Sequence, residues 1–261
     1  MSDPIGFGLD LSHHQKPGAL PWASWRGKVD FVIARAGYGS ARDRHVSEHV
    51  ARSRDIGAKV GLYLFFRPSE PIEPQLDTLL DVAEAVGLGP GDIVPALDIE
   101  QDPIPSPQEV SPDWSAPCLD FVEALEARFG GALVYITQRE WGMLGKPEWV
   151  LKRPLWVAHY TAAKQPATPG NVPATIWQHR VGAFDPAGPG GYTAPKDLPS
   201  GSIQLDQNRL LLPLPLILPA ITDEDRERVP GLVAETIARE LREDADTDPA
   251  PAPEDVDGVP A

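Results

Sequence analysis

The segment Ile93-Val-Pro-Ala-Leu-Asp-Ile-Glu100 is the stretch of sequence that most constrains the fold. Its first five residues are largely apolar, which is typical of a buried strand, and two acids follow. Because side chains alternate along a strand, Asp98 and Glu100 share a face, and at roughly 3.3 Å per residue their Cα atoms lie about 6.6 Å apart. The segment therefore predicts a strand that carries two carboxyl groups to its carboxyl end.

Seven other segments have a similar apolar or alternating character, and helical patterns fill several of the gaps between them. The sequence therefore predicts an α/β fold, an irregular (β/α) barrel with eight strands and fewer than eight helices, over residues 1–218. An eight-helix barrel and an open doubly wound sheet are the alternatives. The other predicted strands are 6–12, 31–37, 60–66, 133–137, 155–160, 175–179 and 202–206, and the predicted helices are 46–56, 74–86 and 117–129.

Residues 219–261 differ in composition from the rest of the chain. From Thr222 onward there are 13 acidic residues and four arginines, so the 261-residue chain, with its net charge of -15, carries only -6 before that point. Apolar residues between Val229 and Leu241 have near-helical spacing, which predicts one amphipathic helix. The Pro-, Ala- and acid-rich remainder has little to bury and is predicted to be disordered. This tail is interpreted as a solvated terminus or as a link to an absent domain or partner.

The composition excludes several classes of protein. No stretch approaches the roughly 18 to 20 consecutive apolar residues of a membrane span, so stable membrane insertion is not expected. A single cysteine, Cys118, excludes a disulfide framework, and its place on a predicted helix favours a buried apolar role. The acidic net charge argues against sequence-independent binding to the phosphate backbone of nucleic acid.

Acids stand at the ends of several predicted strands. The carboxyl ends of parallel barrel strands meet at one face, where active sites form. Asp10 and Asp206 end the first and the eighth strand, as Asp98 and Glu100 end the fourth. Crowded carboxyl groups raise the pKa of one another, which leaves a neutral acid beside a carboxylate. Glycoside hydrolysis requires such a pair.

Other interpretations of the acid pair stay open. Two acids can bind a hard metal ion, although no Asp-rich loop supports one, and the pair can also be purely structural. The six histidines lack the spacing of a zinc site, and the adjacent His13 and His14 are more typical of a groove rim. We therefore predict neither a metal nor a cofactor.

Aromatic residues near the strand ends favour a sugar substrate. Flat ring faces can stack on pyranose rings, and a rim tyrosine can also reach a ligand with its hydroxyl. Trp156 and Trp177 suit the core as well as a sugar subsite. Besides Asp10 and Asp206, the residues expected to bind substrate are Arg35, Tyr38, Tyr63, Phe65, Tyr135, Tyr160 and Gln178.

Eight short motifs occur in a specific order and spacing. They are GLDLSHHQ (8–15), FVIARAGYG (31–39), GLYLFF (61–66), LDIE (97–100), VYIT (134–137), LWVAHY (155–160), IWQH (176–179) and LDQN (205–208). Together these motifs, which span roughly residues 5–212, resemble the lysozymes of glycoside hydrolase family 25.

The resemblance implies cleavage of the β-1,4 bond between N-acetylmuramic acid and N-acetylglucosamine in peptidoglycan. Glu100 then matches the general acid and Asp98 its partner carboxylate, while Asp10 and Asp206 match the other acids of the groove. The expected partner is a peptidoglycan glycan strand bound by a monomer. A glycan-binding barrel without activity and a chitinase-like N-acetylhexosaminidase are the alternatives. The Cα spacing does not decide between substrate-assisted retention and inversion.

The amino-terminal residues suggest a biological setting. Residues 1–10 contain no basic stretch followed by an apolar run, so no signal peptide is predicted. A lysozyme of this kind fits a bacteriophage endolysin, which would reside in the host cytoplasm before its release and then act on the cell wall.

Overall fold

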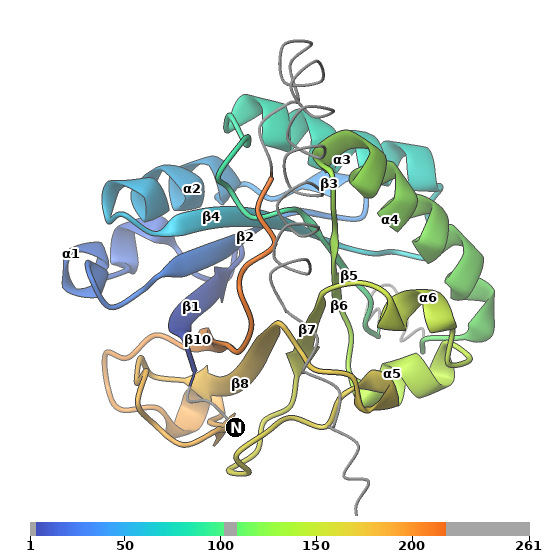
Figure 1. Ribbon diagram of the computed structural model, residues 1–261. Coiled ribbons are helices and arrows are strands. Elements are labelled where there is room, and N and C mark those ends of the chain that lie inside the picture. The colour runs from blue at the N-terminus through green and yellow to red at the C-terminus, as the bar shows by residue number, and fades with distance from the viewer. Residues whose placement is uncertain (1–3, 102–108, 218–261) are drawn as a thin grey trace, which may run out of the picture. The chain divides into compact units, whose positions relative to one another are not determined.

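The computed structural model describes residues 4–101 and 109–217. Eight strands close into a barrel, in the order β1-β10-β8-β7-β6-β5-β4-β2 and back to β1 (Figure 1). The described residues contain six α-helices, so the predicted α/β barrel with eight strands and fewer than eight helices is confirmed. The barrel strands are β1 (Gly6–Leu11), β2 (Phe31–Tyr38), β4 (Lys59–Phe65), β5 (Ala96–Asp98), β6 (Leu133–Tyr135), β7 (Leu155–Ala158), β8 (Ile176–Gly182) and β10 (Leu205–Leu210). The short strands β3 (Ala41–Arg42) and β9 (Gly191–Tyr192) pair with β2 and β8.

One strand of the barrel runs against the others. β10 is antiparallel to both β1 and β8, whereas the remaining neighbours in the barrel are parallel. The predicted last strand, 202–206, was therefore wrong in its bounds and its direction. β10 begins at Leu205, and its polar residues Gln207 and Asn208 are fully buried. A buried strand with so many polar residues lacks the apolar pattern by which strands are recognised.

The fourth strand is shorter than predicted. The segment 93–100 was expected to be one strand, but Pro95 has no N–H to donate, and β5 starts only at Ala96. Ile93 instead forms an isolated antiparallel bridge with Leu216. Asp98 is the last residue of β5, and Glu100 follows it in the loop.

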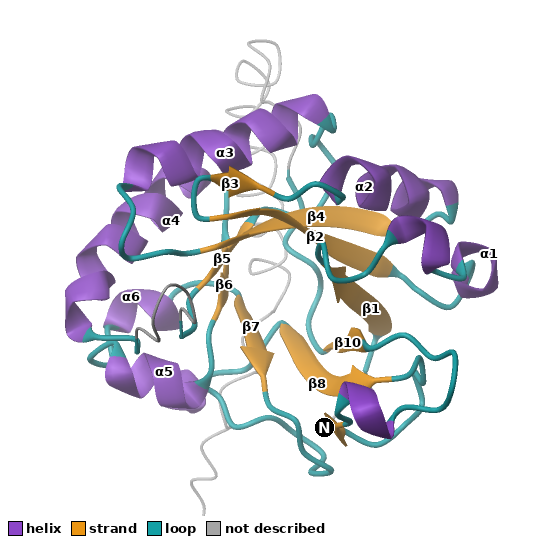
Figure 2. Cartoon of the chain, turned by 180° about the vertical axis from the view of Figure 1, so that it is seen from behind, coloured by secondary structure: helices purple, strands orange, loops and turns teal. Residues whose placement is uncertain are grey.

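Three long helices cover one side of the barrel, as Figures 1 and 2 show from opposite directions. α2 (Val46–Asp55), α3 (Ile72–Ala85) and α4 (Ser115–Phe129) confirm the predicted helices to within two residues. α2 and α3 pack on β2 and β4, and α4 contacts β5. Buried Cys118 lies on α4, as predicted. Among residues 4–101 and 109–217, no comparably long helix covers β8 and β10, where the described loops form the outer layer.

Short helical turns were not predicted. α5 begins with a capping box, in which Thr137 and Glu140 each accept a hydrogen bond from the other's backbone N–H. Each 3₁₀ turn starts at a proline, whose fixed φ suits the first position of a helix. These elements are α1 (Trp22–Trp25), α5 (Gln138–Met143), α6 (Glu148–Leu151) and the 3₁₀ turns Pro17–Ala19, Pro112–Trp114, Pro169–Asn171 and Pro195–Asp197.

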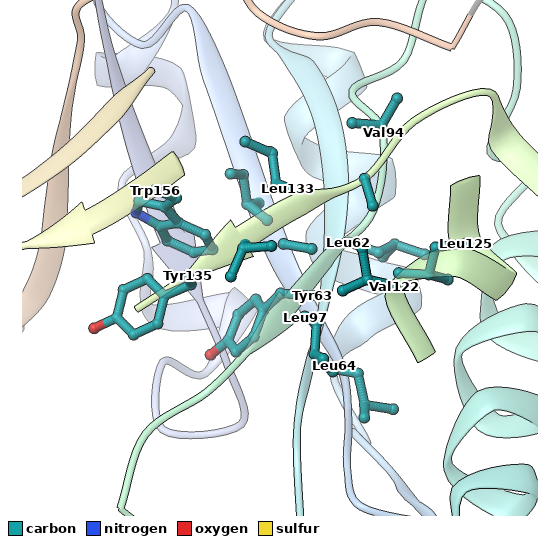
Figure 3. Packing of buried hydrophobic residues seen from close by; sticks show 14 of the residues in the cluster. Leu62, Tyr63, Leu64, Val94, Leu97, Val122, Leu125, Leu133, Tyr135 and Trp156 are labelled. Carbon is teal, nitrogen blue, oxygen red and sulfur yellow. The ribbon is translucent and has the colours of Figure 1, made fainter. Parts of the chain in front are cut away.

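The main hydrophobic core lies between the barrel strands and the helices α2, α3 and α4 that cover them. Alternation along β4 and β5 directs Leu62, Leu64 and Leu97 into this buried cluster. In Figure 3, Tyr63, Tyr135 and Trp156 lie together, away from Val122 and Leu125 of α4. A smaller cluster surrounds β1 and α1 and contains Trp22 and Trp25. The core thus leaves a group of aromatic rings facing the barrel interior.

Two further predictions concern the tail and a membrane span. The amphipathic helix and acidic tail predicted for 219–261 lie outside the described residues. Within residues 4–101 and 109–217, no helix combines the length and apolar character that a membrane span requires.

Candidate active site

A cavity of about 650 Å³ opens at the end of the barrel where the parallel strands finish. Strands from around the whole barrel contribute to its lining, so it lies at the mouth and not between outer loops. Every residue singled out from the sequence as a candidate lines it. These residues are Asp10, Arg35, Tyr38, Tyr63, Phe65, Asp98, Glu100, Tyr135, Tyr160, Gln178 and Asp206.

The reversed strand brings Asp206 to this mouth. Asp206 was expected at the carboxyl end of a parallel strand, but it is the second residue of antiparallel β10. The first residues of an antiparallel strand lie beside the last residues of its neighbours. Asp206 accordingly pairs in register with Asp10 near the end of β1 and with Val181 near the end of β8.

An irregularity in β2 places two further candidates. Arg35 and Tyr38 are three residues apart, so a regular strand would send their side chains to opposite faces. The register with β4 shifts between Arg35 and Gly37, which leaves Ala36 as an extra residue. Such a bulge reverses the alternation, and both side chains therefore line the cavity.

A chain of hydrogen bonds fixes Asp10. Its Oδ2 accepts from Gln178 Nε2 at 2.9 Å and from Asn208 Nδ2 at 2.7 Å. Gln178 Oε1 accepts from the hydroxyls of Tyr135 and Tyr160 at 2.9 and 2.5 Å, which sets the orientation of its amide. Trp156 Nε1 donates to Asn208 Oδ1 at 2.8 Å. Burial raises the pKa of Asp10 to about 6, and the two amide donors oppose that rise.

The carboxyl groups of Asp98, at the end of β5, and of Glu100, in the loop that follows, have strongly perturbed pKa values. Asp98 is 4% exposed, and its Oδ1 has no hydrogen-bond partner among the described residues. Burial first, and then the nearby Glu100, raise the pKa of Asp98 well above its ordinary range. Burial, followed by the charges of Glu140 and Asp10, raises the pKa of Glu100 to about 8. At neutral pH this pair therefore retains at least one proton.

Asp206 completes the group of acids. Its pKa is raised well above the ordinary value, mainly by burial and then by the charges of Asp10 and Glu100. Arg35 is the cation that opposes these shifts at Asp98 and Glu100, although its effect is smaller than that of burial. The mouth thus holds protons at a pH where exposed carboxyl groups would have lost them.

Aromatic rings form the walls of the cavity. Trp156 contacts Tyr63 and Tyr135 edge to face, with ring centroids 5.7 and 4.8 Å apart, and Figure 3 shows this group. Phe65, two residues after Tyr63 on β4, lies against Tyr38 with ring centroids 4.7 Å apart. Tyr160 is 40% exposed, so its ring is open to a ligand at the rim. Trp177, the other ambiguous tryptophan, is buried away from the cavity and donates to His159 O.

Several residues at the site were not selected from the sequence. Glu140 is buried and raises the pKa of both β5 acids, and its capping-box position after Thr137 was the available signal. Asn208, within the LDQN motif, supports Asp10. His13 and His14 were expected at a rim and do line the cavity. Its remaining lining residues are Ser12, Ala41, Arg42, Asp43, Arg44 and Trp156.

Comparisons with known proteins agree on one family. The sequence profile described as "Glycosyl hydrolases family 25" matches residues 9–183. The bacterial lysozyme from Streptomyces coelicolor is 24% identical, with a TM-score of 0.63 over 81% of this chain and 94% of that one. A family GH25 lysozyme from Aspergillus fumigatus is 22% identical, with a TM-score of 0.61 over 80% and 94%. The catalytic domain of endolysin ply40 from bacteriophage P40 of Listeria monocytogenes is 20% identical, with a TM-score of 0.57 over 80% and 95%. No match was found among curated protein sequences.

A barrel with paired carboxyl groups of raised pKa at its mouth has the architecture of a glycoside hydrolase. The family profile covers more than half of the sequence, and the chain belongs to glycosyl hydrolase family 25. It is a glycoside hydrolase of the lysozyme type, and peptidoglycan hydrolysis is the activity that this membership supports.

Proposed function

We propose that the protein is an N-acetylmuramidase, which cleaves the β-1,4 bond between N-acetylmuramic acid and N-acetylglucosamine, with Glu100 as the general acid. The observation that carries this proposal is the position of Glu100 in the cavity at the mouth of the barrel, two residues after Asp98, where burial and the neighbouring acids raise its pKa to about 8. A carboxyl group that is still protonated at neutral pH can give its proton to the glycosidic oxygen as the bond breaks.

Asp98 has the partner role in this proposal. Its buried Oδ1 has no hydrogen-bond partner among the described residues, and an unpaired buried acceptor calls for a donor. The N–H of the substrate's 2-acetamido group is such a donor. With its N–H held there, the acetamido oxygen bonds to the anomeric carbon while the leaving oxygen takes the proton of Glu100. Water then attacks the same carbon, the bond from that carbon to the acetamido oxygen breaks, and the Glu100 carboxylate takes the proton that the water gives up.

The other cavity residues position the sugar in this scheme. Asp10 is fixed by two amide donors, so its geometry does not depend on the substrate. Asp206 adds a second carboxyl group beside Asp10, on the neighbouring strand β10. Tyr63, Tyr135 and Tyr160 present ring faces and hydroxyl groups to the glycan. Preorganised polar groups of this kind stabilise charge that develops only as the bond breaks.

Digestion of purified cell walls tests the proposed bond. Soluble fragments identified by mass spectrometry should end in a reducing N-acetylmuramic acid. Fragments that end in reducing N-acetylglucosamine would show that the other glycosidic bond is cut. Cleavage of chitin oligomers in preference to walls would indicate a chitinase-like enzyme, and binding without soluble fragments would indicate a carbohydrate-binding barrel.

Proton NMR of the first product tests the route. Substrate assistance proceeds with two displacements at the anomeric carbon and gives the β anomer first. A first-formed α anomer would mean that Asp98 activates water directly and that the configuration inverts. A role in releasing bacteriophage from the host stays a prediction from the sequence, as does residence in the host cytoplasm.

A further inference from the structure

The cavity carries opposite charges in two regions. Asp10, Asp98, Glu100 and Asp206 occupy the catalytic region. A second group, here called the cationic rim, consists of His13, His14, Arg35, Arg42 and Arg44, and it lines the same cavity. The rim is built from the segment that follows β1 and from the β2–β3 hairpin with its next turn. Uncharged sugar rings need no such cations, so the rim points to an anionic group elsewhere on the substrate.

Asp43 organises the rim without neutralising it. This buried carboxylate accepts from the backbone N–H of His13 at 2.8 Å and from Arg35 Nε at 3.0 Å through the same oxygen. Its other oxygen accepts from the backbone N–H of His45 at 2.9 Å. Both oxygens are therefore occupied by groups that hold the loop in place. Asp43 pairs with Arg35 alone among the three arginines that line the cavity here, which leaves an excess of positive charge.

Two arginines of the rim are available to a ligand. Arg44 is exposed and makes no hydrogen bond or ion pair with the described residues. Arg42 is exposed as well, and its guanidinium donates one hydrogen bond to Ser47 Oγ at 3.0 Å. A guanidinium offers five N–H donors in a planar fork that fits an oxyanion. The pair can thus accept an anion without breaking an existing ion pair.

The two histidines of the rim lie against each other, and one of them contacts Arg35. Their rings lie 3.9 Å apart, and His13 Nδ1 contacts the Arg35 guanidinium. Burial and then the charge of Arg35 lower the pKa of both His13 and His14. Asp43 opposes this effect, while Arg44 adds to it. The positive charge of the rim therefore comes from its arginines, and an anion bound beside the imidazoles would favour their protonation.

We propose that the cationic rim binds a carboxylate on the peptide branch of the glycan, and so selects peptide-bearing peptidoglycan over bare polysaccharide. The inference rests on the proposed function, because the branch is attached to the N-acetylmuramic acid that occupies the catalytic region. A carboxylate tied to that sugar is held within the same cavity, whereas a phosphate polymer elsewhere in the wall is not. Tethering raises the effective concentration of the carboxylate at the rim.

Chemical neutralisation of the substrate tests the inference. Glycan strands that retain their peptides are compared with the same strands after carbodiimide coupling of the carboxyl groups to methylamine. The wild type should lose about tenfold in kcat/KM on the neutralised strands, the size of one charge-assisted contact. R44A should lose about tenfold on the charged strands and much less on the neutralised ones, while R44K keeps part of the activity.

Matched controls separate the outcomes. R52A removes an exposed arginine of α2 that does not line the cavity, and it should behave as the wild type on both substrates. Equal wild-type rates on charged and neutralised strands, or an equal loss in R44A on both, would overturn the inference. A rate that falls when wall phosphate polymers are removed, but not on amidation, would assign the rim to phosphate and overturn it too. Failure to cleave either substrate would instead contradict the proposed function.

Discussion

The helix-covered and loop-covered sides of the barrel contribute differently to the cavity. β4 and β5, packed under α3 and α4, are apolar strands that end in Phe65 and Asp98. β8 and β10, under loops, carry buried polar residues such as Gln178 and Asn208. The first side supplies the perturbed acid pair, and the second holds Asp10 in place by hydrogen bonds. Burial raises the pKa of carboxyl groups on both sides, since Asp206 lies on β10, and the loop-covered side also supplies the hydrogen bonds that orient Asp10.

The largest expected effect falls on the helix-covered side. Glu100→Gln keeps the shape of the side chain but removes the proton donor, so kcat on cell walls should fall by roughly 10²- to 10⁴-fold. The rate of turbidity loss measures it, and an unchanged circular dichroism spectrum shows that the variant is folded. Near wild-type clearance by E100Q would rule out Glu100 as the general acid.

Another large effect is expected from disturbing a close backbone contact on the loop-covered side. A Cβ on Gly190 would stand 1.9 Å from Thr161 O, so Gly190→Ala forces the segment beside β9 away from β8. We expect a loss of roughly 3 kcal/mol in the free energy of unfolding, measured by denaturant titration. Gly89→Ala is the matched control, because its Cβ meets no atom within 4 Å. Equal stabilities of the two variants would show that the segment is not packed as described.

The pH dependence of stability distinguishes the two sides further. Folding raises the pKa of Glu100 from 4.5 to about 8, so folding disfavours its charged form. The resulting cost is absent below about pH 4.5, grows as pH rises, and is complete above about pH 8. Glu100→Gln should therefore match the wild type in stability at pH 4 and exceed it at pH 9 by up to roughly 5 kcal/mol, or roughly 10 to 20 °C in Tm.

Calorimetry at both pH values measures this difference. Glu84→Gln, at an exposed position on α3, is the control and should follow the wild type throughout. A difference between E100Q and the wild type that is the same at pH 4 and pH 9 would contradict the assigned shift.

The smallest effect concerns the support of Asp10. Asn208→Ala removes a donor at 2.7 Å that favours the charged form of Asp10, so the pKa of Asp10 should rise further. We expect about a tenfold loss of kcat at pH 6 and an acid limb of the pH–rate profile shifted upward by roughly one unit. Trp156→Phe leaves the Asn208 donor in place and should shift this limb less. A limb that stays at the same pH in N208A would show that Asp10 does not control it.

The helix-covered side could be predicted well from the sequence. Its strands and helices bury continuous or periodic apolar faces, and α2, α3 and α4 were located closely. Asp98 ends such a strand and Glu100 follows it in the loop, and both line the cavity as the sequence predicted. The catalytic roles of all candidate residues remain predictions.

The loop-covered side could be predicted only in part, for physical reasons. Gln207 and Asn208 are buried by hydrogen bonding and not by apolar character, so β10 was placed too early and with the wrong direction. On the helix-covered side, the bulge at Ala36 was also missed, because it depends on pairing with β4, which no local pattern encodes. Arg42 and Arg44 were missed because exposed arginines in a hairpin usually mark solvated surface.

Because β1 pairs with β10, the site is complete only after the last strand of the barrel has joined the first. Asp10 receives its donors from residues 168 and 198 positions further along the chain. Closing so long a loop is entropically costly and comes after local helix formation. In a refolding experiment, recovery of activity should therefore lag behind recovery of helical signal and coincide with closure of the barrel. During synthesis, the nascent chain cannot assemble this site until β10 has emerged from the ribosome.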